Sequence, residues 1–378
     1  MQGAGLYLHI PYCVVRCTYC DFYSQVGAEE GSGRFFAALQ KDLRTFPERH
    51  RYHPPVATVF FGGGTPSHAP PEAIAATLDT IREVFSLGPD AEITLEANPE
   101  SVDAARLEMW REAGINRLSF GIQSLRPELL SLMGRPHGAE QAMAALRLAR
   151  SAAFENISGD FIFGLPGQTA ESWGEDLERI GGMGLDHISC YLLETDKPTP
   201  MSRAIASGQL AEPDAGTVAA QFEATAIALA RHGYRRYEIS NFCRPGRECR
   251  HNMGYWEDGP WLGFGPSAHG SWEGRRTEVP LTAEAYSATV EQGEEPLRVH
   301  PPGSSAERSA EALITGLRLE YGVDLSVLSR RYGLDLERRH AAAIETEIRR
   351  GRLVREGPRL RLTPGGVLFS NDVLCRFV

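Results

Sequence analysis

Short apolar stretches alternate with longer amphipathic stretches through the first 240 residues. The short stretches are rich in β-branched and aromatic residues, as in strands, whereas the longer ones place apolar residues three or four positions apart, as in helices. The pattern predicts strands at Leu6–Ile10, Thr58–Phe61, Glu92–Glu96, Arg117–Phe120, Ile157–Phe163, His187–Leu192 and Arg236–Ile239. It predicts helices at Arg34–Arg44, Pro71–Phe85, Ala104–Ala113, Ala139–Ala152, Ala170–Ile180 and Ala215–His232. Because strands alternate with helices, we expect a parallel sheet in a complete or partial α/β barrel.

The pattern changes in the last third of the chain. Residues Asn241–Trp272 are rich in Gly, Pro and Trp, so we predict an irregular segment, and long segments of this kind are often functional. A linker is expected near residue 300. Beyond it, helical spacing followed by the short strands Leu353–Arg355 and Arg359–Leu362 is typical of a small winged-helix-like α+β domain. We therefore predict three parts, at residues 1–240, 241–300 and 301–378.

Composition and charge narrow the class of protein. The chain of 378 residues has a formal net charge of −10, which disfavours a general nucleic-acid coat, although residues 301–378 carry 13 arginines against 10 acidic residues. A solvated helix face explains those arginines more simply than DNA or RNA binding does. No apolar run approaches the roughly 20 residues of a membrane span, and the first residues lack a secretory signal. We therefore expect a cytoplasmic protein without a transmembrane segment.

Three of the seven cysteines lie within eight positions near the start of the chain. Cys13, Cys17 and Cys20 follow the first predicted strand with C-x3-C-x2-C spacing, which indicates metal binding rather than disulfides. Three thiolates can hold an iron–sulfur cluster and leave one iron of a four-iron cluster without a protein ligand. Zinc is the alternative, but it would require a fourth nearby Cys or His, and none of the next three residues is either.

Polar or glycine-rich residues lie in or after each of the next four predicted strands. The carboxyl ends of parallel strands meet at one face, so these residues could share a ligand site. Each of them also has a structural explanation, because glycine turns and strand-end carboxylates are common without a ligand, although a carboxylate inside an apolar strand requires a partner. The candidates are Gly63, Gly64, Thr65, Glu96, Gln123 and Asp160.

The cysteine loop closely resembles the signature of the radical-SAM superfamily. The resemblance implies a [4Fe–4S] cluster on the three cysteines, with the amino and carboxylate groups of S-adenosylmethionine (SAM) on the open iron. Cleavage of SAM to a deoxyadenosyl radical is the chemistry that such a site makes available. The resemblance also implies that Gly63, Gly64 and Thr65 contact the methionyl amino group, and that the fold is a partial (β/α)6-type barrel.

The surrounding residues resemble more specifically the coproporphyrinogen-dehydrogenase-like branch of that superfamily, which includes the HemN and HemW families. The similarity covers nearly the whole chain and includes His9-Ile10-Pro11-Tyr12-Cys13 and Cys20-Asp21-Phe22. By this resemblance, the positions that contact the cofactor are Tyr7, Tyr19, Glu96, Gln123, Arg135 and Asp160. Taken alone, Arg135 could equally form a surface ion pair.

Two features favour the HemW side of this branch. HemN proteins carry a further cysteine two residues after the third cluster ligand, whereas this chain has Phe22 there. The stretch His251–Trp256 contains an H-N-x-x-Y-W pattern that resembles the heme-contacting element of HemW proteins. The resemblance makes His251 the candidate axial ligand of heme. His269 and Cys249 are alternative ligands, and a histidine beside aromatic residues can also be purely structural.

The resemblance implies a heme chaperone that transfers heme to an acceptor hemoprotein, which could be membrane-associated, with a flavodoxin or ferredoxin as electron donor. The sequence leaves open whether SAM is cleaved. The alternative hypothesis is a radical-SAM enzyme that acts on a tetrapyrrole or another substrate, as an oxygen-independent coproporphyrinogen III oxidase or a methyltransferase does. Phe22 disfavours coproporphyrinogen dehydrogenation. Nucleic-acid binding through the C-terminal domain is a third hypothesis, disfavoured by the net charge.

Overall fold

A curved sheet forms the main body of the protein in the computed structural model, which describes residues 3–27 and 29–378. Seven neighbouring strands of this sheet run parallel. Most of their apolar side chains are buried in the main hydrophobic core. In spatial order they are β11 (Trp261–Phe264), β1 (Ala4–Ile10), β4 (Pro55–Gly63), β5 (Ser86–Ala97), β6 (Arg117–Gln123), β7 (Ile157–Phe163) and β8 (His187–Leu192). Six of the seven predicted strands therefore exist, five of them within three residues at each end, whereas β5 begins six residues before the predicted Glu92.

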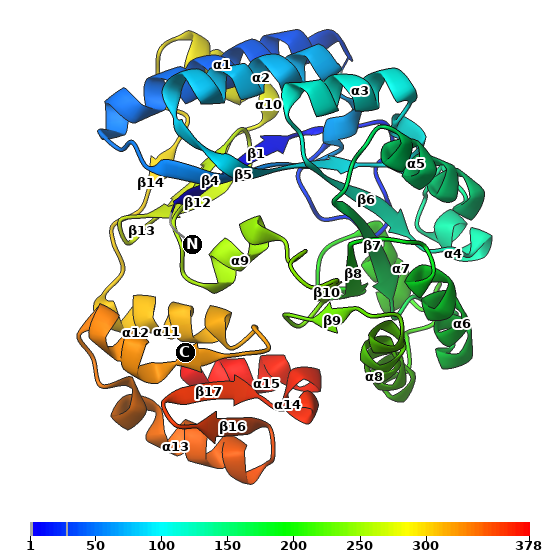
Figure 1. Ribbon diagram of the computed structural model, residues 1–378, viewed down its shortest axis with the longest axis vertical. Helices are drawn as coiled ribbons and strands as arrows, with labels where there is room; N and C mark the ends of the chain where they lie inside the picture. Colours follow the sequence, from blue (N-terminus) through cyan, green and yellow to red (C-terminus); the bar gives the residue numbers. More distant parts are fainter. Residues whose placement is uncertain (1–2, 28) are drawn as a thin grey trace.

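Helices cover the outer, convex face of the sheet, whose hydrophobic side chains they bury (Figure 1). Local signals set their ends: Asp103 and Asp214 accept hydrogen bonds from backbone amides of the first helical turn, and Thr169 forms a capping box with Ser172. The covering helices are α1 (Glu29–His50), α2 (Pro71–Val84), α3 (Ala104–Ala113), α5 (Ala139–Ser151), α6 (Ala170–Gly181) and α8 (Ala215–Arg231).

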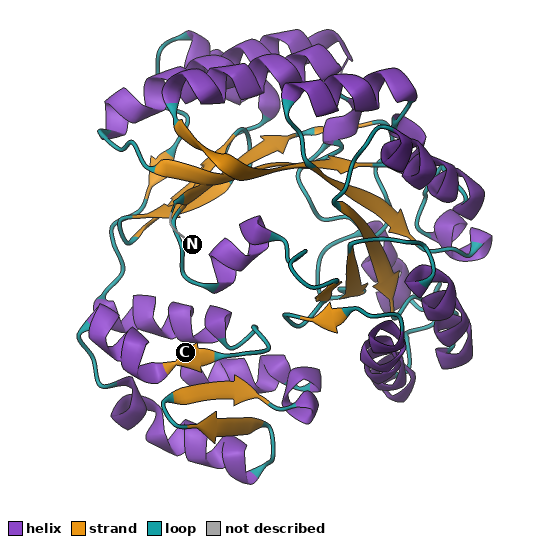
Figure 2. Ribbon diagram, in the orientation of Figure 1, coloured by secondary structure: helices purple, strands orange, loops and turns teal. Residues whose placement is uncertain are grey.

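Short antiparallel strands extend the sheet at both ends, so that it stays open and forms a partial barrel (Figure 2). Beyond β11 lie β12 (His269–Trp272), β13 (Arg275–Glu278) and β14 (Arg298–Val299). Beyond β8 lie β10 (Asn241–Cys243) and β9 (Arg235–Arg236), so the predicted strand Arg236–Ile239 is mostly wrong. The remaining small elements are β2 (Tyr12–Cys13), β3 (Gln25–Val26), α4 (Pro127–Leu132), α7 (Pro200–Ala206), α10 (Ala283–Glu291), and the 3-10 turns Pro66–His68 and Pro99–Ser101.

The segment Asn241–Trp272 is more ordered than its composition predicts. It contains β10, the helix α9 (Arg250–Trp256), β11 and β12, and β11 pairs in parallel with β1. Helix α9 lies on the concave side of the curved sheet, under the arch of strands (Figure 1). The prediction of an irregular segment was wrong because its helix and strands are too short, at seven residues or fewer, to show a clear apolar period among the Gly and Pro residues.

A smaller domain with its own hydrophobic core follows residue 304. Its three-stranded antiparallel sheet has the order β15 (Val323–Asp324), β17 (Arg359–Leu362), β16 (Leu353–Glu356). The helices are α11 (Ser305–Gly316), α12 (Leu325–Tyr332), α13 (Leu336–Arg349), α14 (Pro364–Leu368) and α15 (Ser370–Leu374), with the 3-10 turn Cys375–Phe377. This is the predicted winged-helix-like α+β unit. In the described part of the chain, no helix has the length and apolar character needed to cross a membrane.

Candidate functional site

The three cysteines lie on a loop that leaves the first parallel strand at its carboxyl end. Cys13 ends β2, Cys17 is buried, and Cys20 is partly exposed. Burial, with smaller contributions from the Cys17 and Cys13 thiols, raises the pKa of Cys20 to about 11. In the described residues, no three His, Cys, Asp or Glu side chains are arranged for a single metal ion. The thiols of a four-iron cluster bind different irons, so they need not be arranged around a single metal ion.

Hydrogen-bond donors from two distant segments contact the cysteine sulfurs. Thr65 Oγ1 donates to Cys13 Sγ at 3.4 Å, and Arg135 Nη1 donates to Cys17 Sγ at 3.4 Å. Arg135 Nη2 also donates to Asn98 Oδ1 at 2.7 Å, and Asn98 Nδ2 donates to Thr65 Oγ1 at 3.5 Å. Asn98 therefore joins the two donors. A cation and a hydroxyl beside thiolates stabilise their charge, which is what cluster ligands require.

The glycine segment after β4 is pressed against the backbone of the cysteine loop. Gly63 has φ +105°, and a Cβ atom there would come within 2.6 Å of the His9 ring. A Cβ atom at Gly64 would lie 2.7 Å from the carbonyl oxygen of Tyr12. The amides of Gly64 and Thr65 donate to the carbonyl groups of Ile10 and Tyr12 at 2.8 and 2.7 Å. Only glycine permits this approach, and the amides that could have bound a ligand hold the loop instead.

Two buried carboxylates interact across the sheet: Glu96 is the next-to-last residue of β5, and Asp160 lies in the middle of β7. Asp160 accepts hydrogen bonds from Ser119 Oγ at 3.0 Å and Ser189 Oγ at 2.6 Å, and burial raises its pKa. Burial and the charge of Asp160 raise the pKa of Glu96 to about 8, although the amide of Gly63 opposes this shift. A pair of carboxylates in this position can accept hydrogen bonds from an amine or from ribose hydroxyls.

Three further candidates surround these groups. Gln123 ends β6 with φ +67° at a register shift of the sheet, and a non-glycine residue in this conformation costs about 1–3 kcal/mol and is often found at functional sites. Tyr7 lies beside Glu96 and hydrogen-bonds His9 Nδ1 at 3.2 Å. Tyr19 packs against the hydrophobic cluster that includes Leu129 and Met133, and its hydroxyl interacts with Cys17.

The residues present fit an iron–sulfur cluster with SAM. Arg135 has a buried Nε atom with no hydrogen-bond partner among the described residues, so a carboxylate of a ligand could accept from it. Glu96 provides an acceptor for an amino group. The structure thus brings all the sequence-predicted cofactor residues except His251 together around one face of the barrel. They are Tyr7, Cys13, Cys17, Tyr19, Cys20, Gly63, Gly64, Thr65, Glu96, Gln123, Arg135 and Asp160.

A cavity of about 570 Å³ lies between this face and the C-terminal domain. The cysteine loop contributes Phe22, whose side chain is 61% exposed, and α9 contributes Tyr255 and Trp256. The exposed ring of His269 also borders the cavity. Six aromatic residues line it in total, namely Tyr7, Phe22, Tyr23, Tyr255, Trp256 and Trp261. We call it the loop cavity.

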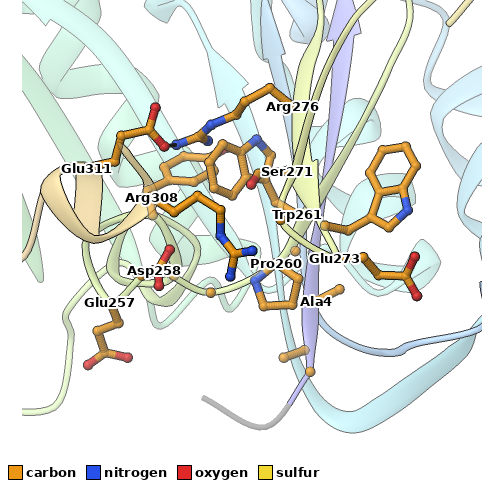
Figure 3. Close-up of a pocket in the computed structure, with 18 of the residues that line it drawn as sticks. Ala4, Glu257, Asp258, Pro260, Trp261, Ser271, Glu273, Arg276, Arg308 and Glu311 are labelled. Carbon is orange, nitrogen blue, oxygen red and sulfur yellow. Dashed lines mark hydrogen bonds and ion pairs between the residues drawn. The ribbon is translucent and has the colours of Figure 1, made fainter. Parts of the chain in front are cut away.

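A second cavity of about 650 Å³, which we call the seam cavity, is also lined by Tyr255 and Trp261. Figure 3 shows this cavity with Trp261, Arg276 and Glu311 at its border. Both cavities are lined by Tyr255, Asp258, Trp261, Arg276 and Glu311. Arg276 lies 4.9 Å from the centre of the Trp261 ring and donates to Glu311 Oε2 at 2.7 Å, which joins β13 to α11. Many charged side chains line the seam cavity, including Glu257, Asp258, Glu273, Arg276, Glu307, Arg308, Glu311 and Arg331.

His251, the predicted heme ligand, is only 2% exposed and has both ring nitrogens engaged. Its Nδ1 hydrogen-bonds Thr58 Oγ1 at 2.7 Å, and its Nε2 hydrogen-bonds Tyr255 Oη at 2.7 Å. The ring stacks on Phe60, and burial followed by the charge of Arg117 lowers the pKa of His251 to about 3. The imidazole is therefore neutral near pH 7, and the structure places it behind Tyr255 rather than in the loop cavity.

Helix α9 is anchored by a residue that sequence analysis missed. The buried carboxylate of Glu92 accepts from the amides of Arg250 at 3.1 Å and His251 at 3.0 Å and lies 3.7 Å from Cys249 Sγ. Arg117 is also buried nearby. Glu92 and Arg117 each begin a predicted strand, and their charge was the available signal, because buried charges require partners. Asn98 was equally missed, although it lies two residues after Glu96.

Comparison with known proteins agrees with this geometry. Residues 7–180 match the family model of the radical SAM superfamily, and residues 304–369 match that of the HemN C-terminal domain. The chain is 36% identical to the heme chaperone HemW of Mycobacterium tuberculosis, over 99% of this chain and 94% of that protein. It is 31% identical to the heme chaperone HemW of Bacillus subtilis, over 98% of both. A solved structure of the radical SAM enzyme coproporphyrinogen III oxidase (HemN) from Escherichia coli matches with a TM-score of 0.86 at 23% identity, over 100% of this chain and 90% of that one.

These matches define a radical-SAM protein and confirm the predicted α/β fold with a partial barrel. Membership of that superfamily implies a [4Fe–4S] cluster and SAM. Within the superfamily, the chain belongs to the HemW family, as its near full-length identity to the mycobacterial and Bacillus proteins shows. The likeness to HemN, at lower identity, concerns the fold alone.

Proposed function

We propose that this protein is a heme chaperone, which binds a [4Fe–4S] cluster, SAM and heme and transfers the heme to an acceptor hemoprotein. The observation that carries the proposal is the loop cavity, because it borders both the cysteine loop, through Phe22, and helix α9, through Tyr255 and Trp256. The names of the bacterial relatives support the same function. Heme bound there would lie next to the cluster.

The loop cavity suits a porphyrin better than the seam cavity does. Ligand pockets usually span about 300–1,000 Å³ and are lined mainly by apolar and aromatic groups, with a few polar groups that orient the ligand. The loop cavity has this character, whereas many charged side chains line the seam cavity. Arg276, on the wall between them, could meet a propionate if it left Glu311.

The candidate cofactor residues would have the following roles. Cys13, Cys17 and Cys20 would hold the cluster, with Arg135 and Thr65 stabilising the thiolates. Gly63, Gly64 and Thr65 would contact the methionyl amino group, and Arg135 would contact the carboxylate of SAM. Glu96, Gln123 and Asp160 would contact the amino group and the ribose. Tyr7 and Tyr19 would shape the two sides of the site. When bound, the reduced cluster with SAM supplies one-electron chemistry.

For the iron of heme we propose His251 as the axial ligand. Thr58 fixes its Nδ1 atom, which leaves Nε2 as the coordinating nitrogen, an arrangement typical of metal-binding histidines whose other nitrogen is held by a neighbour. His269 is the alternative, since its exposed ring already borders the loop cavity. The two assignments differ in what must move: His251 requires Tyr255 to leave Nε2, and His269 requires no movement.

Redox and delivery partners would approach from the open side of the cysteine loop. Val14 and Val15 are 55% and 44% exposed there, which leaves the cluster accessible to an electron donor such as a flavodoxin or ferredoxin. The acceptor hemoprotein, possible membrane association of that acceptor, and the cytoplasmic location stay predictions from the sequence. Several arginines of the C-terminal domain are in ion pairs with acidic residues, which supports the solvated-surface interpretation over nucleic-acid binding.

Anaerobic reconstitution with iron, sulfide, SAM, reductant and heme tests this function against enzymatic turnover. We expect stoichiometric heme binding, transfer to an apo-hemoprotein, and no modified tetrapyrrole. Heme binding should weaken in His251→Ala and persist in His269→Ala. Formation of a decarboxylated or methylated tetrapyrrole from coproporphyrinogen or heme would instead establish the enzyme hypothesis and overturn the chaperone proposal. Salt-sensitive binding of duplex DNA would revive the nucleic-acid hypothesis.

A further inference from the structure

The hydroxyl of Tyr255 is hydrogen-bonded to Nε2 of His251, the nitrogen that we propose as the heme ligand. Tyr255 follows His251 by four residues on α9, so the two side chains lie on the same face of the helix. The Tyr255 hydroxyl lies 2.7 Å from Nε2, and the ring planes meet at 79° with their centres 5.0 Å apart. In the tautomer that carries its hydrogen on Nδ1, this nitrogen donates to Thr58 Oγ1, and the lone pair of Nε2 accepts from the Tyr255 hydroxyl.

Tyr255 has space on both sides into which it can turn. It lines the loop cavity and the seam cavity, and its ring contacts Trp261 edge to face with the centres 4.9 Å apart. His251, in contrast, borders only the seam cavity. A ligand in the loop cavity therefore reaches His251 Nε2 only after the phenol has moved toward the seam cavity.

The residues that follow Tyr255 are held by the C-terminal domain, so the helix end itself is fixed. Arg318 lies 4.5 Å from the Trp256 ring centre, and Tyr321 donates to Glu257 at 2.6 Å. Asp258 accepts from Arg331 at 2.9 Å and from the hydroxyl of Tyr332. At the other end, Glu92 caps the helix. Exposure of Nε2 is therefore achieved most easily by rotation of the Tyr255 side chain, with α9 remaining in place.

We propose that Tyr255 is a release residue, whose hydroxyl competes with heme iron for His251 Nε2. This inference rests on the proposed function and adds how that site takes up and gives up its cargo. On binding, the O–H···N hydrogen bond breaks, the phenol keeps its proton and turns toward the seam cavity, and the Nε2 lone pair binds the iron. On transfer, the iron–nitrogen bond breaks and the phenol returns to Nε2. No proton or electron is exchanged with solvent in either direction.

The test is a double-mutant cycle on heme affinity and heme release with the full-length, cluster-loaded protein. Because a net hydrogen bond contributes about 0.5–1.5 kcal/mol, Tyr255→Phe should bind heme about threefold to tenfold more tightly and release it correspondingly more slowly. The effect should vanish when His251→Ala is also present, since the phenol acts only through that nitrogen. The Soret band should keep the position of a histidine-ligated heme.

Tyr234→Phe is the matched control, because it removes a buried phenol hydroxyl that donates to the Leu185 carbonyl group, away from both cavities. It should leave heme affinity and release unchanged. Weaker binding by Tyr255→Phe, or loss of a phenolate-to-iron charge-transfer band, would show that Tyr255 ligates the iron and would overturn the inference. Unchanged affinity in Tyr255→Phe would also overturn it. Failure of the wild-type protein to bind heme would instead overturn the proposed function, which separates the two claims.

Discussion

The cofactor face of the barrel and the loop cavity are neighbours built in different ways. The cofactor face collects residues from the ends of consecutive parallel strands, and each contribution comes from a short segment such as Cys13–Cys20 or Gly63–Thr65. The loop cavity collects single side chains from the cysteine loop, α9, β11, β13 and α11, which lie far apart in sequence. The first is determined by sheet topology, and the second by how α9 and the C-terminal domain pack.

This difference teaches where specificity within the fold resides. A partial barrel with a cysteine loop brings cofactor ligands together whatever the substrate, because the strand ends converge on one face. The concave side is where α9 lies, and α9 and β11 supply Tyr255, Trp256 and Trp261 to the loop cavity. We therefore expect substitutions in the two regions to have separable effects on cluster content and on heme binding.

The largest expected effect comes from removing a cluster ligand. Cys17→Ala should abolish cluster assembly, since two thiolates cannot hold the cluster in place of three, and iron and acid-labile sulfide should fall about tenfold or more. The far-ultraviolet circular dichroism should not change. Cys375→Ala, at an exposed cysteine near the C-terminus, is the control and should retain the cluster. Normal iron and sulfide content in Cys17→Ala would contradict the ligand assignment.

Truncation of Phe22 tests the loop cavity without disturbing the core. The side chain is already 61% exposed, so Phe22→Ala should leave stability nearly unchanged but remove an apolar surface for heme. We expect heme affinity to fall about fivefold to tenfold, measured by absorbance titration, with SAM binding unaffected. Phe369→Ala removes a comparably exposed phenylalanine from the C-terminal domain and serves as the control. Equal losses in both variants would refute the cavity assignment.

Glu96 gives a prediction for pH. The pKa of Glu96 is raised to about 8 in the folded state. At a pH below 8 but above the ordinary pKa of a glutamate, the folded protein therefore keeps a proton on Glu96 that the unfolded chain has released. The contribution to stability is therefore greatest at low pH and is lost as pH rises toward and through 8. Glu96→Gln should remove this loss, gaining about 1–2 kcal/mol relative to wild type between pH 6 and pH 9 in cofactor-free protein. A stability difference that stays constant over this range, in urea unfolding, would exclude the raised pKa.

The smallest expected effect concerns the ion pair between the sheet and the C-terminal domain. Arg276 and Glu311 are 43% and 52% exposed, so their pair should contribute about 0.2–1 kcal/mol, and less at high salt. Arg276→Gln should lower the unfolding temperature slightly at low salt and not at 1 M salt. Arg298→Gln breaks a similar exposed pair within the sheet and provides the comparison. A large loss at high salt would mean that Arg276 acts through Trp261 instead.

The sequence predicted which residues the strand ends bring together, whereas their roles toward a cofactor stay predictions. The cysteine spacing, the glycines after β4, and the carboxylates of Glu96 and Asp160 lie in segments whose chemistry is visible from neighbouring residues, and parallel strands then bring them together. The winged-helix-like unit was visible for the same reason, since its helices and hairpin are local patterns. Six of the main strands were predicted in place.

The loop cavity and the burial of His251 could not be predicted in this way. The H-N-x-x-Y-W stretch looked irregular because a helix of seven residues has too few turns to show apolar periodicity. The position of helix α9 depends on Glu92, which is 159 residues from His251 in sequence, and on contacts with the C-terminal domain. Asn98 was missed because its importance lies in two side-chain contacts, to Thr65 and Arg135, that no local pattern reveals.

The proximity of heme to the cluster is the most direct test of the proposed function. Pulsed electron paramagnetic resonance of the fully reduced protein, which holds a reduced cluster and five-coordinate high-spin ferrous heme, measures the magnetic coupling between the two paramagnetic centres. Heme in the loop cavity predicts strong coupling, with faster relaxation of the cluster signal in wild type than in Phe22→Ala at equal cluster content. Stoichiometric heme without any effect on cluster relaxation would place the heme elsewhere and contradict the account.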